Sequence, residues 1–477
     1  MADTINVILN EVKNLYQDTI VAPATTPGTG AISIIRISGP EAFRITDSVV
    51  RLASGTVSEA AGYTIHYGEV PGLDDVLVSV FRALHSYTGE DSVEISTHAS
   101  AYIVQELVQR LLASGARFAE PGEFTRRAFL NGKMDLAQAE AVADVIAAGT
   151  AAAHRVAMNQ LKGGFSRELS SLRSELLEMA SLLELELDFS EEDVEFADRS
   201  KLLTLLDEGK KHIDTLAASF RQGNLIKNGV PVAIVGPANA GKSTLLNALV
   251  GEERAIVTDI PGTTRDTLEE TLTLGGILFR FIDTAGIRAS EDTVEKLGIE
   301  RSLKKMEQAE VILAVIDAQA SAEEIRPILE QVKSSPAKAF LLLNKAEKMG
   351  PEECNKIVNV INSVVTSIDY KIDIILFSAK TGLGMEELKT KLLEAENGLI
   401  PNAESTFVTN ARHFEALQNA SSALAACHNA LSLGIPSDLV AEDLRRALAS
   451  INAILGTDLL DPEEILHNIF SKHCIGK

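Results

Sequence analysis

The chain has 477 residues, of which 45% are hydrophobic and 23% are charged, and its formal net charge at pH 7 is -23. This composition excludes wholesale disorder, and no apolar run reaches the ~20 residues that a membrane-spanning helix needs. A chain with this much negative charge repels nucleic acid, so a general nucleic-acid binder is excluded. Any nucleic acid must then be recognised at a local site.

Residues 1–131 are predicted to form an α+β domain. Short β-branched runs at residues 32–37, 76–81 and 92–96 lie between Gly and Pro residues and are typical of strands. Residues 102–113 have helical spacing. The first 17 residues form a short amphipathic extension to which no chemistry is assigned.

Residues 132–225 and 394–477 are predicted to be helical. Apolar residues recur close to helical spacing in both segments, at Leu172, Leu176, Leu177 and Leu183 and at Leu444, Leu448, Ile451 and Leu455. Eight acidic and no basic residues lie in the run 184–198, which is either a solvated helix end or a patch for a cation or partner. Because the chain between the two segments is built differently, we predict one helical domain interrupted by an insert.

The insert, residues 226–393, contains the pattern G-x-x-x-x-G-K-S at residues 236–243. A buried-strand pattern at 230–235 precedes it and a helix at 244–250 follows, which is the order that phosphate binding requires. Backbone N–H groups of the glycine loop wrap phosphates, Lys242 reaches the β and γ oxygens, and the Ser243 hydroxyl ligates Mg²⁺. A chance match that binds nothing is the alternative, and the strand and helix on either side argue against it.

Further strands are predicted at residues 277–282, 311–316, 340–343 and 372–377, and motifs follow three of them at the edge where open α/β sheets bind ligands. Asp283 can hold Mg²⁺ through water, Gly286 can sense the γ-phosphate, and Thr264 can complete the magnesium shell. Together these motifs predict a Ras-like P-loop domain that binds GTP. The expected nucleotide contacts are Asn239, Ala240, Gly241, Lys242, Ser243, Thr244, Asp283, Thr284, Ala285, Gly286, Asn344, Lys345, Glu347, Ser378, Ala379 and Lys380.

Two residues depart from the general pattern of such domains. Glu347 stands where an Asp usually accepts from guanine; it keeps the acceptor on a side chain one methylene longer, so guanine preference is still expected. Ile287 stands where Ras-like GTPases have a Gln that orients the attacking water. An Ile side chain can neither orient nor polarise water. Hydrolysis must then recruit another group, such as Glu291, Asp292 or Glu295, unless this stretch is only a solvated switch loop.

The sequence after residue 17 resembles the MnmE (TrmE) family of tRNA-modification GTPases over nearly its whole length. The resemblance rests on Asp-Thr-Ile-Val-Ala at 18–22, Arg-Ile-Ser-Gly at 36–39, Ser-Tyr-Thr-Gly-Glu-Asp at 86–91, Pro-Gly-Glu-Phe-Thr-Arg-Arg-Ala-Phe-Leu-Asn-Gly-Lys at 121–133, Asp-Phe-Ser-Glu-Glu-Asp at 188–193 and Cys-Ile-Gly-Lys at 474–477. It implies an N-terminal domain at 1–131 that binds 5-formyl-tetrahydrofolate or a related one-carbon folate and forms a homodimer. It also implies a helical domain split into 132–225 and 394–477, with the G domain inserted at 226–393.

The resemblance also implies roles for single residues. The folate contacts would be Arg36, Glu94, Lys133 and Lys477. A K⁺ ion would replace an arginine finger, with Asn239 as its side-chain ligand, and Glu295 would orient water. The remaining ion and nucleotide contacts would come from Thr258, Asp259, Ile260, Pro261, Gly262, Thr263 and Thr264, with Thr258, Ile260 and Thr263 supplying oxygens to K⁺. The family often continues after Glu94 with a His-Gly-Gly turn, whereas this chain has His98, Ala99 and Ser100, so that loop's conformation stays open.

Cys474 has three interpretations. A prenylation box is excluded because Gly476 and Lys477 do not fit one, and a buried structural cysteine is not expected so near the chain end. A thiol that takes part in chemistry is favoured by His473 and Lys477 nearby. We therefore take Cys474, with Lys242 and Glu295, as the catalytic candidates. The three cysteines are far apart and no signal-peptide pattern occurs, so a cytoplasmic protein is expected.

Two functional hypotheses follow. The first is a K⁺-dependent GTPase that, with the flavin-dependent MnmG protein in a heterotetramer, modifies C5 of the wobble uridine of certain tRNAs, with no membrane or DNA partner. Arg126, Arg127 and neighbouring cations would contact the tRNA. The second is a regulatory GTPase switch of the Era-like, ribosome-assembly type without covalent chemistry. A dynamin-like membrane GTPase is more distant, because no basic amphipathic helix occurs.

Overall fold

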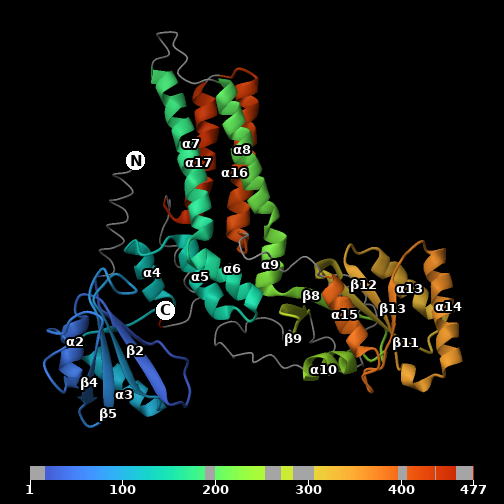
Figure 1. Ribbon diagram of the computed structural model, residues 1–477, viewed down its shortest axis with the longest axis horizontal. Helices are drawn as coiled ribbons and strands as arrows, with labels where there is room; N and C mark the ends of the chain where they lie inside the picture. The colour runs from blue at the N-terminus through green and yellow to red at the C-terminus, as the bar shows by residue number, and fades with distance from the viewer. Residues whose placement is uncertain are drawn as a thin grey trace. The chain divides into compact units, whose positions relative to one another are not determined.

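The computed structural model describes residues 17–188, 199–252, 270–282, 306–395, 406–435, 437–457 and 476 (Figure 1). The chain forms two compact units. One comprises Met1–Ala147, Ala157–Ala217 and Ala411–Lys477, and the other Ala148–Val156 and Ala218–Asn410. No helix in the described ranges is both long and apolar enough to cross a membrane.

A seven-stranded sheet organises the N-terminal part of the first unit, in the order β3-β4-β5-β6-β2-β1-β7. Its strands are β1 (Ile20–Pro23), β2 (Ile32–Ser38), β3 (Arg51–Leu52), β4 (Thr64–Val70), β5 (Asp74–Phe81), β6 (Ser92–His98) and β7 (Arg117–Phe118). Neighbouring strands are antiparallel except β1 and β7. The predicted strands at 32–37, 76–81 and 92–96 are confirmed.

Alternation along the strands separates a core face from an outer face of this sheet. Ile35, Ile37 and Ile95 are buried in one cluster with residues of α2 (Ala42–Val49) and α3 (Ala101–Ala113). Arg36 and Glu94, each next to a core residue in the sequence, must therefore point to the opposite face, and they are paired across β2 and β6. The helix predicted at 102–113 is confirmed as α3.

Every element in the described parts of 132–225 and 406–457 is a helix. Along the chain, the helices that follow the strands of the first sheet are α4 (Glu123–Leu130), α5 (Leu136–Ala147), α6 (Ala151–Leu161), α7 (Gly164–Asp188), α8 (Arg199–Ala218) and α9 (Phe220–Asn228). Helices α16 (Ala411–Ser432) and α17 (Ser437–Leu455) come after the second sheet in the sequence. Helices α7, α8, α16 and α17 run side by side as a bundle (Figure 1). The helical segment predicted from Leu172, Leu176, Leu177 and Leu183 is confirmed, since all four lie in α7. Leu172, Leu176 and Leu183 are buried, whereas Leu177 is 46% exposed because it lies about 100° around the helix from Leu176. The side chains of run 184–198 lie outside the described residues.

The second unit is built on a six-stranded sheet in the order β13-β12-β11-β8-β10-β9, parallel except where β9 pairs with β10. The strands are β8 (Val230–Val235), β9 (Glu270–Leu274), β10 (Ile277–Phe281), β11 (Val311–Asp317), β12 (Lys338–Asn344) and β13 (Asp373–Leu376). The predicted strands are confirmed, and β8 has the predicted bounds.

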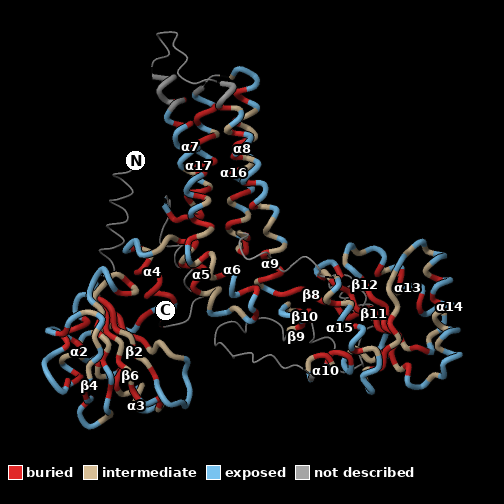
Figure 2. Tube along the Cα trace, in the orientation of Figure 1, coloured by how far each residue is buried: buried red, intermediate tan, exposed pale blue. Residues whose placement is uncertain are grey.

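Helices cover both faces of this second sheet. One apolar cluster joins the sheet to α10 (Lys242–Glu252) and α15 (Met385–Ala395), and another joins it to α13 (Ala322–Lys333) and α14 (Pro351–Ser367). Figure 2 shows the central strand β11 buried and the outer helix α14 largely exposed. The predicted fold class is thus confirmed: an α+β N-terminal domain, an all-helical part and an open parallel α/β sheet.

Candidate functional site

The loop between β8 and α10 is shaped by two glycines at the carboxyl edge of the parallel strands. Gly236 has φ +144, and a Cβ atom there would lie 2.1 Å from the carbonyl oxygen of Val315. Gly241 has φ +98, and its Cβ would lie 2.1 Å from Nδ2 of Asn344. Only glycine permits both approaches. The loop is therefore held close to its neighbours and leads directly into the N-terminus of α10, a preferred place for phosphate.

Polar groups surround this loop. Nζ of Lys242 donates to the carbonyl oxygens of Gly236 at 3.0 Å and Pro237 at 2.7 Å. Asn239 has φ +61, a left-handed conformation that Asn tolerates better than most residues. Ser243 and Thr244 are exposed in the first turn of α10, and Ala240 is buried. The exposed Ser243 hydroxyl and the dipole of α10 fit the chemistry of a nucleotide phosphate with Mg²⁺.

Asn344 joins the phosphate loop to the next two loops. Its Nδ2 donates to the carbonyl oxygen of Ala240 at 2.8 Å, and its Oδ1 accepts from the N–H of Ala379 at 3.0 Å. The side chain is buried, and its bond to Ala240 is shielded from water, whereas its bond from Ala379 is half-buried. The nucleotide contact of Asn344 stays a prediction, whereas its bridging position is what the structure shows.

Lys345 and Glu347 lie beside this bridge. Lys345 has φ +65, and its Nζ lies 2.8 Å from Oδ2 of Asp317, which is paired with Asn344 across β11 and β12. Burial by itself raises the pKa of Asp317, but the hydrogen bond and charge of Lys345 outweigh it and hold that pKa below its usual value. Asp317 was missed in the sequence, although an Asp at the end of a predicted buried strand was a usable signal.

Glu347 is exposed in the short 3-10 helix η2 (Ala346–Lys348). A hydrogen bond from Ser378 lowers its pKa, so the carboxylate is ionised at neutral pH. Ser378 is buried, Ala379 is half-buried and Lys380 is exposed in the loop after β13. An ionised acceptor at this position suits a base with adjacent N–H donors, as guanine has.

Several predicted residues lie outside the described residues. They are Thr258, Asp259, Ile260, Pro261, Gly262, Thr263, Thr264, Asp283, Thr284, Ala285, Gly286, Ile287, Glu291, Asp292, Glu295, Cys474 and Lys477. Within the part of the chain that is described, no group of three His, Cys, Asp or Glu side chains could hold a metal ion.

A second polar site lies on the outer face of the N-terminal sheet. Nε and Nη2 of Arg36 both reach Oε1 of Glu94, at 2.9 and 2.8 Å. The guanidinium also lies 5.3 Å from the ring centroid of Tyr87 and 5.6 Å from that of Phe124. Its third nitrogen, Nη1, donates to the carbonyl oxygen of Gly476 at 3.2 Å. The Arg36 and Glu94 side chains keep 17% and 25% exposure, so a ligand can still reach the pair.

One loop connects this pair to Lys133. Nζ of Lys133 donates to the carbonyl oxygen of Leu84 at 2.8 Å, and Tyr87 of the same loop packs on Arg36. Three of the four predicted folate contacts are therefore linked through residues 84–87. Tyr87, Phe124 and Gly476 were missed as site residues, although each belongs to a motif on which the family resemblance rests.

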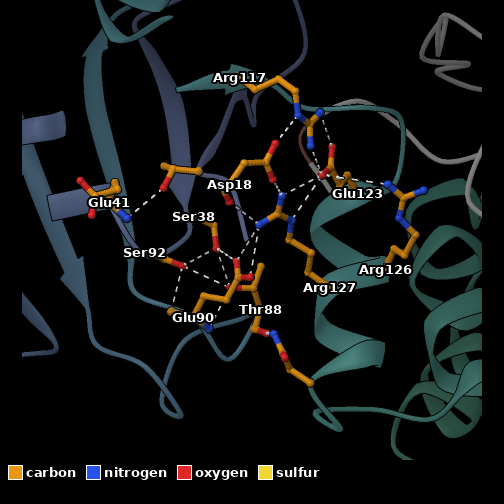
Figure 3. A network of polar contacts seen from close by, with 12 residues as sticks. Asp18, Ser38, Glu41, Thr88, Glu90, Ser92, Arg117, Glu123, Arg126 and Arg127 are labelled. Atoms are coloured by element: carbon orange, nitrogen blue, oxygen red, sulfur yellow. Dashed lines mark hydrogen bonds and ion pairs between the residues drawn. The ribbon is translucent and has the colours of Figure 1, made fainter. Parts of the chain in front are cut away.

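Arg126 and Arg127 are occupied by buried ion pairs (Figure 3). Arg127 is 1% exposed, and its guanidinium lies 2.6 Å from Asp18, 2.9 Å from Glu123 and 3.2 Å from Glu90. The side chain of Arg126 is 6% exposed and lies 2.9 Å from Glu120. The prediction that these two arginines contact tRNA is wrong, because both side chains are buried and buried charges require partners. Arg127 joins α4 to Asp18 and Glu90, whereas Arg126 pairs with Glu120 at the start of the same segment.

Comparisons with known proteins cover nearly the whole chain. Residues 136–474 match the family described as MnmE helical domain, and residues 19–133 match GTP-binding protein TrmE N-terminus. The tRNA modification GTPase MnmE of Bacteroides fragilis is 48% identical over 97% of this chain and 100% of its own length. That of Flavobacterium psychrophilum is 47% identical with the same coverage. A solved structure of Era in complex with MgGDPNP and ribosomal RNA is 27% identical, with a TM-score of 0.28, over 41% of this chain and 66% of that one.

Proposed function

Since this chain belongs to the MnmE family of tRNA modification GTPases, we propose that it hydrolyses GTP in a K⁺-dependent reaction to modify C5 of the wobble uridine of certain tRNAs. It would act with the flavin-dependent MnmG protein, as a homodimer within a heterotetramer, in the cytoplasm. The added group would be aminomethyl or carboxymethylaminomethyl, with its one-carbon unit drawn from 5-formyl-tetrahydrofolate or a related folate. We also propose that the domains of this chain end at residues 131, 225 and 393.

One observation carries this proposal: a single chain has a glycine-shaped phosphate loop tied to the loop after β13 by Asn344, and a separate Arg36–Glu94 site. A regulatory switch needs only the first. The second gives a cation and a carboxylate with apolar ring faces beside them, which suits a flat polar heterocycle with an acidic tail. Arg36, Glu94, Lys133 and Lys477 would contact the folate, and the Cys474 thiol would take part in the chemistry.

At the nucleotide site, Lys242 would bind the β and γ oxygens, and Asn344 would hold the loop in the shape that binds them. Mg²⁺ would be held by Ser243, Thr264 and Asp283. Asn239 would bind K⁺ with oxygens of Thr258, Ile260 and Thr263. These cations, when bound, offset negative charge that develops on the phosphates. Glu295 would orient the attacking water, since Ile287 cannot.

Two measurements test the proposal. The first is mass spectrometry of wobble uridines from a strain lacking this chain, complemented with wild type or Arg36→Ala. We expect C5 modification to vanish, to return with wild type and to stay low with the variant. Unchanged modification in the deletion strain would overturn the proposal in favour of a regulatory switch.

The second measurement is GTP turnover in matched K⁺ and Na⁺ buffers, for wild type and Glu295→Ala. We expect turnover to need K⁺ and to fall at least ~100-fold in the variant, in the range of general acid–base contributions. Equal rates in the two buffers would remove K⁺ from the mechanism, and an undiminished variant would remove Glu295.

A further inference from the structure

The loop between β5 and β6 positions two side chains beside the proposed folate site. The N–H of Leu84 donates to the carbonyl oxygen of Gly89 at 3.0 Å and closes the loop. Within it, the ring of Tyr87 packs on Arg36, and the carbonyl oxygen of Leu84 holds Nζ of Lys133. Gly89 has φ +81, and a Cβ atom there would lie 3.4 Å from Cγ and Cδ of Lys133. The conformation of this loop therefore sets the places of Tyr87 and Lys133.

The end of the loop is anchored in a buried polar network through Glu90 (Figure 3). Oε2 of Glu90 accepts from Oγ of Ser38 at 2.8 Å, and its backbone N–H donates to Oγ1 of Thr88 at 3.2 Å. Oγ of Ser38 also lies 2.7 Å from Oγ1 of Thr88 and 3.0 Å from Oγ of Ser92. Oε1 of Glu90 lies 3.2 Å from Nη1 of Arg127. Since the three hydroxyl residues are buried, these bonds fix the loop to β2 and α4.

The charge of Glu90 is not needed to neutralise Arg127. The guanidinium lies 2.6 Å from Asp18 and 2.9 Å from Glu123, closer than to Glu90. Burial raises the pKa of the Glu90 carboxyl above 4.5, and the charge of Arg127 and the hydrogen bond from Ser38 offset this only in part. The unfolded chain therefore ionises first as the pH rises, so the charge on Glu90 makes the fold less stable at neutral pH. A carboxylate kept at this cost is typical of a functional site.

We propose, on the basis of the one-carbon function proposed above, that Glu90 is a positioning residue for the folate. Its carboxylate accepts from β2 and from α4 at the same time, and so holds the loop between β5 and β6 in the conformation that places Tyr87 beside Arg36 and Lys133 beside Leu84. A folate then meets these groups already arranged, and less conformational entropy is lost when it binds. The ionised carboxylate lowers the stability of the fold and favours binding.

The test begins with Glu90→Gln, which keeps the size of the side chain. It replaces one accepting oxygen by an NH₂ donor, and that group cannot accept from Ser38 or Arg127. The matched control is Glu106→Gln, which makes the same change in a half-exposed ion pair with Arg110 on α3. Helix α3 packs on the core face of the sheet, away from the proposed folate site.

Hydrogen exchange of the amides of Leu84 and Glu90 measures the anchoring of the loop without any ligand. We expect exchange at least ~10-fold faster in Glu90→Gln, the scale of a lost hydrogen bond to a charged group, and no change in Glu106→Gln. Unchanged exchange in Glu90→Gln, or wild-type exchange as fast as in an unstructured peptide, would overturn the anchoring.

Folate binding and stability together separate positioning from a merely structural role. Titration of the intact protein with (6S)-5-formyl-tetrahydrofolate should give a Kd about 10-fold higher in Glu90→Gln, whereas the thermal unfolding midpoint should stay equal or rise. In the modification reaction the KM for folate should rise to the same extent with kcat nearly unchanged, because saturating folate restores the loop. A lower midpoint with an unchanged Kd would overturn positioning.

A second variant keeps the proposal testable if Glu90→Gln does not fold. Ser38→Ala removes one partner of the Glu90 carboxylate without a change of charge, and it should also raise the Kd for folate. An unchanged Kd in Ser38→Ala would then overturn positioning. If wild type binds no folate, the proposed one-carbon function fails, whereas hydrogen exchange still decides the anchoring of the loop.

Discussion

Replacing Asn344 by Ala removes the bridge between the phosphate loop and the loop after β13. Two hydrogen bonds are lost, and the carbonyl oxygen of buried Ala240 and the N–H of half-buried Ala379 lose this partner. Each bond contributes about 1 kcal/mol net and an unsatisfied buried group costs more, so we expect a loss of about 2 to 3 kcal/mol. If the whole loss appears in nucleotide binding, because the phosphate loop no longer keeps its binding conformation, the Kd for GTP rises roughly 30- to 150-fold.

The assay is titration of the intact protein with a fluorescent GTP analogue. Asn362→Ala on the exposed surface of α14 is the control and should bind like wild type. Asn344→Asp separates the two bonds, because it keeps the acceptor for Ala379 but sets a carboxylate oxygen against the carbonyl of Ala240. We expect it to bind no better than Asn344→Ala. A Kd for Asn344→Ala within threefold of wild type, or full recovery in Asn344→Asp, would refute the bridging argument.

Three further predictions concern other parts of the chain. Glu347→Asp should keep or tighten GTP binding, because Asp presents the same acceptor closer to the backbone; equal affinity of the wild type for ATP would contradict the guanine assignment. Burial raises the pKa of Glu140, but the hydrogen bonds and charges of His413 and Arg412 outweigh it and lower that pKa from 4.5 to about 2. Glu140→Gln should therefore reduce the free energy of opening of α5, measured by hydrogen exchange, by roughly 3 kcal/mol at neutral pH. The difference between wild type and variant should shrink as pH falls from 4.5 towards 2, because the wild-type carboxylate becomes protonated there. Cys474→Ser should lose tRNA modification, and a variant that still modified tRNA would reject the thiol role.

Local features could be predicted well because they depend on neighbours in the sequence. The apolar run at 230–235 and the glycines after it specify a buried strand and a phosphate loop within a few residues. Helical spacing likewise predicted the buried face of α17, where Leu444 and Ile451 are fully buried. The family resemblance led to the prediction that Arg36, Glu94 and Lys133 contact folate. From their spacing in the sequence alone, these residues would be classed as ordinary surface ions.

Only the tertiary structure decided which charges are available to a partner. Arg127 is basic and lies in a motif, but Asp18, 109 positions earlier, and Glu90 neutralise it inside the fold. In the same way Arg36 meets Gly476 from the other end of the chain. The sequence by itself determined the elements, the phosphate loop and the overall negative charge. Which side chains converge and which charges are buried depends on distant segments packing together, because the free energy of a charge is set by its surroundings in space and not by its neighbours along the chain.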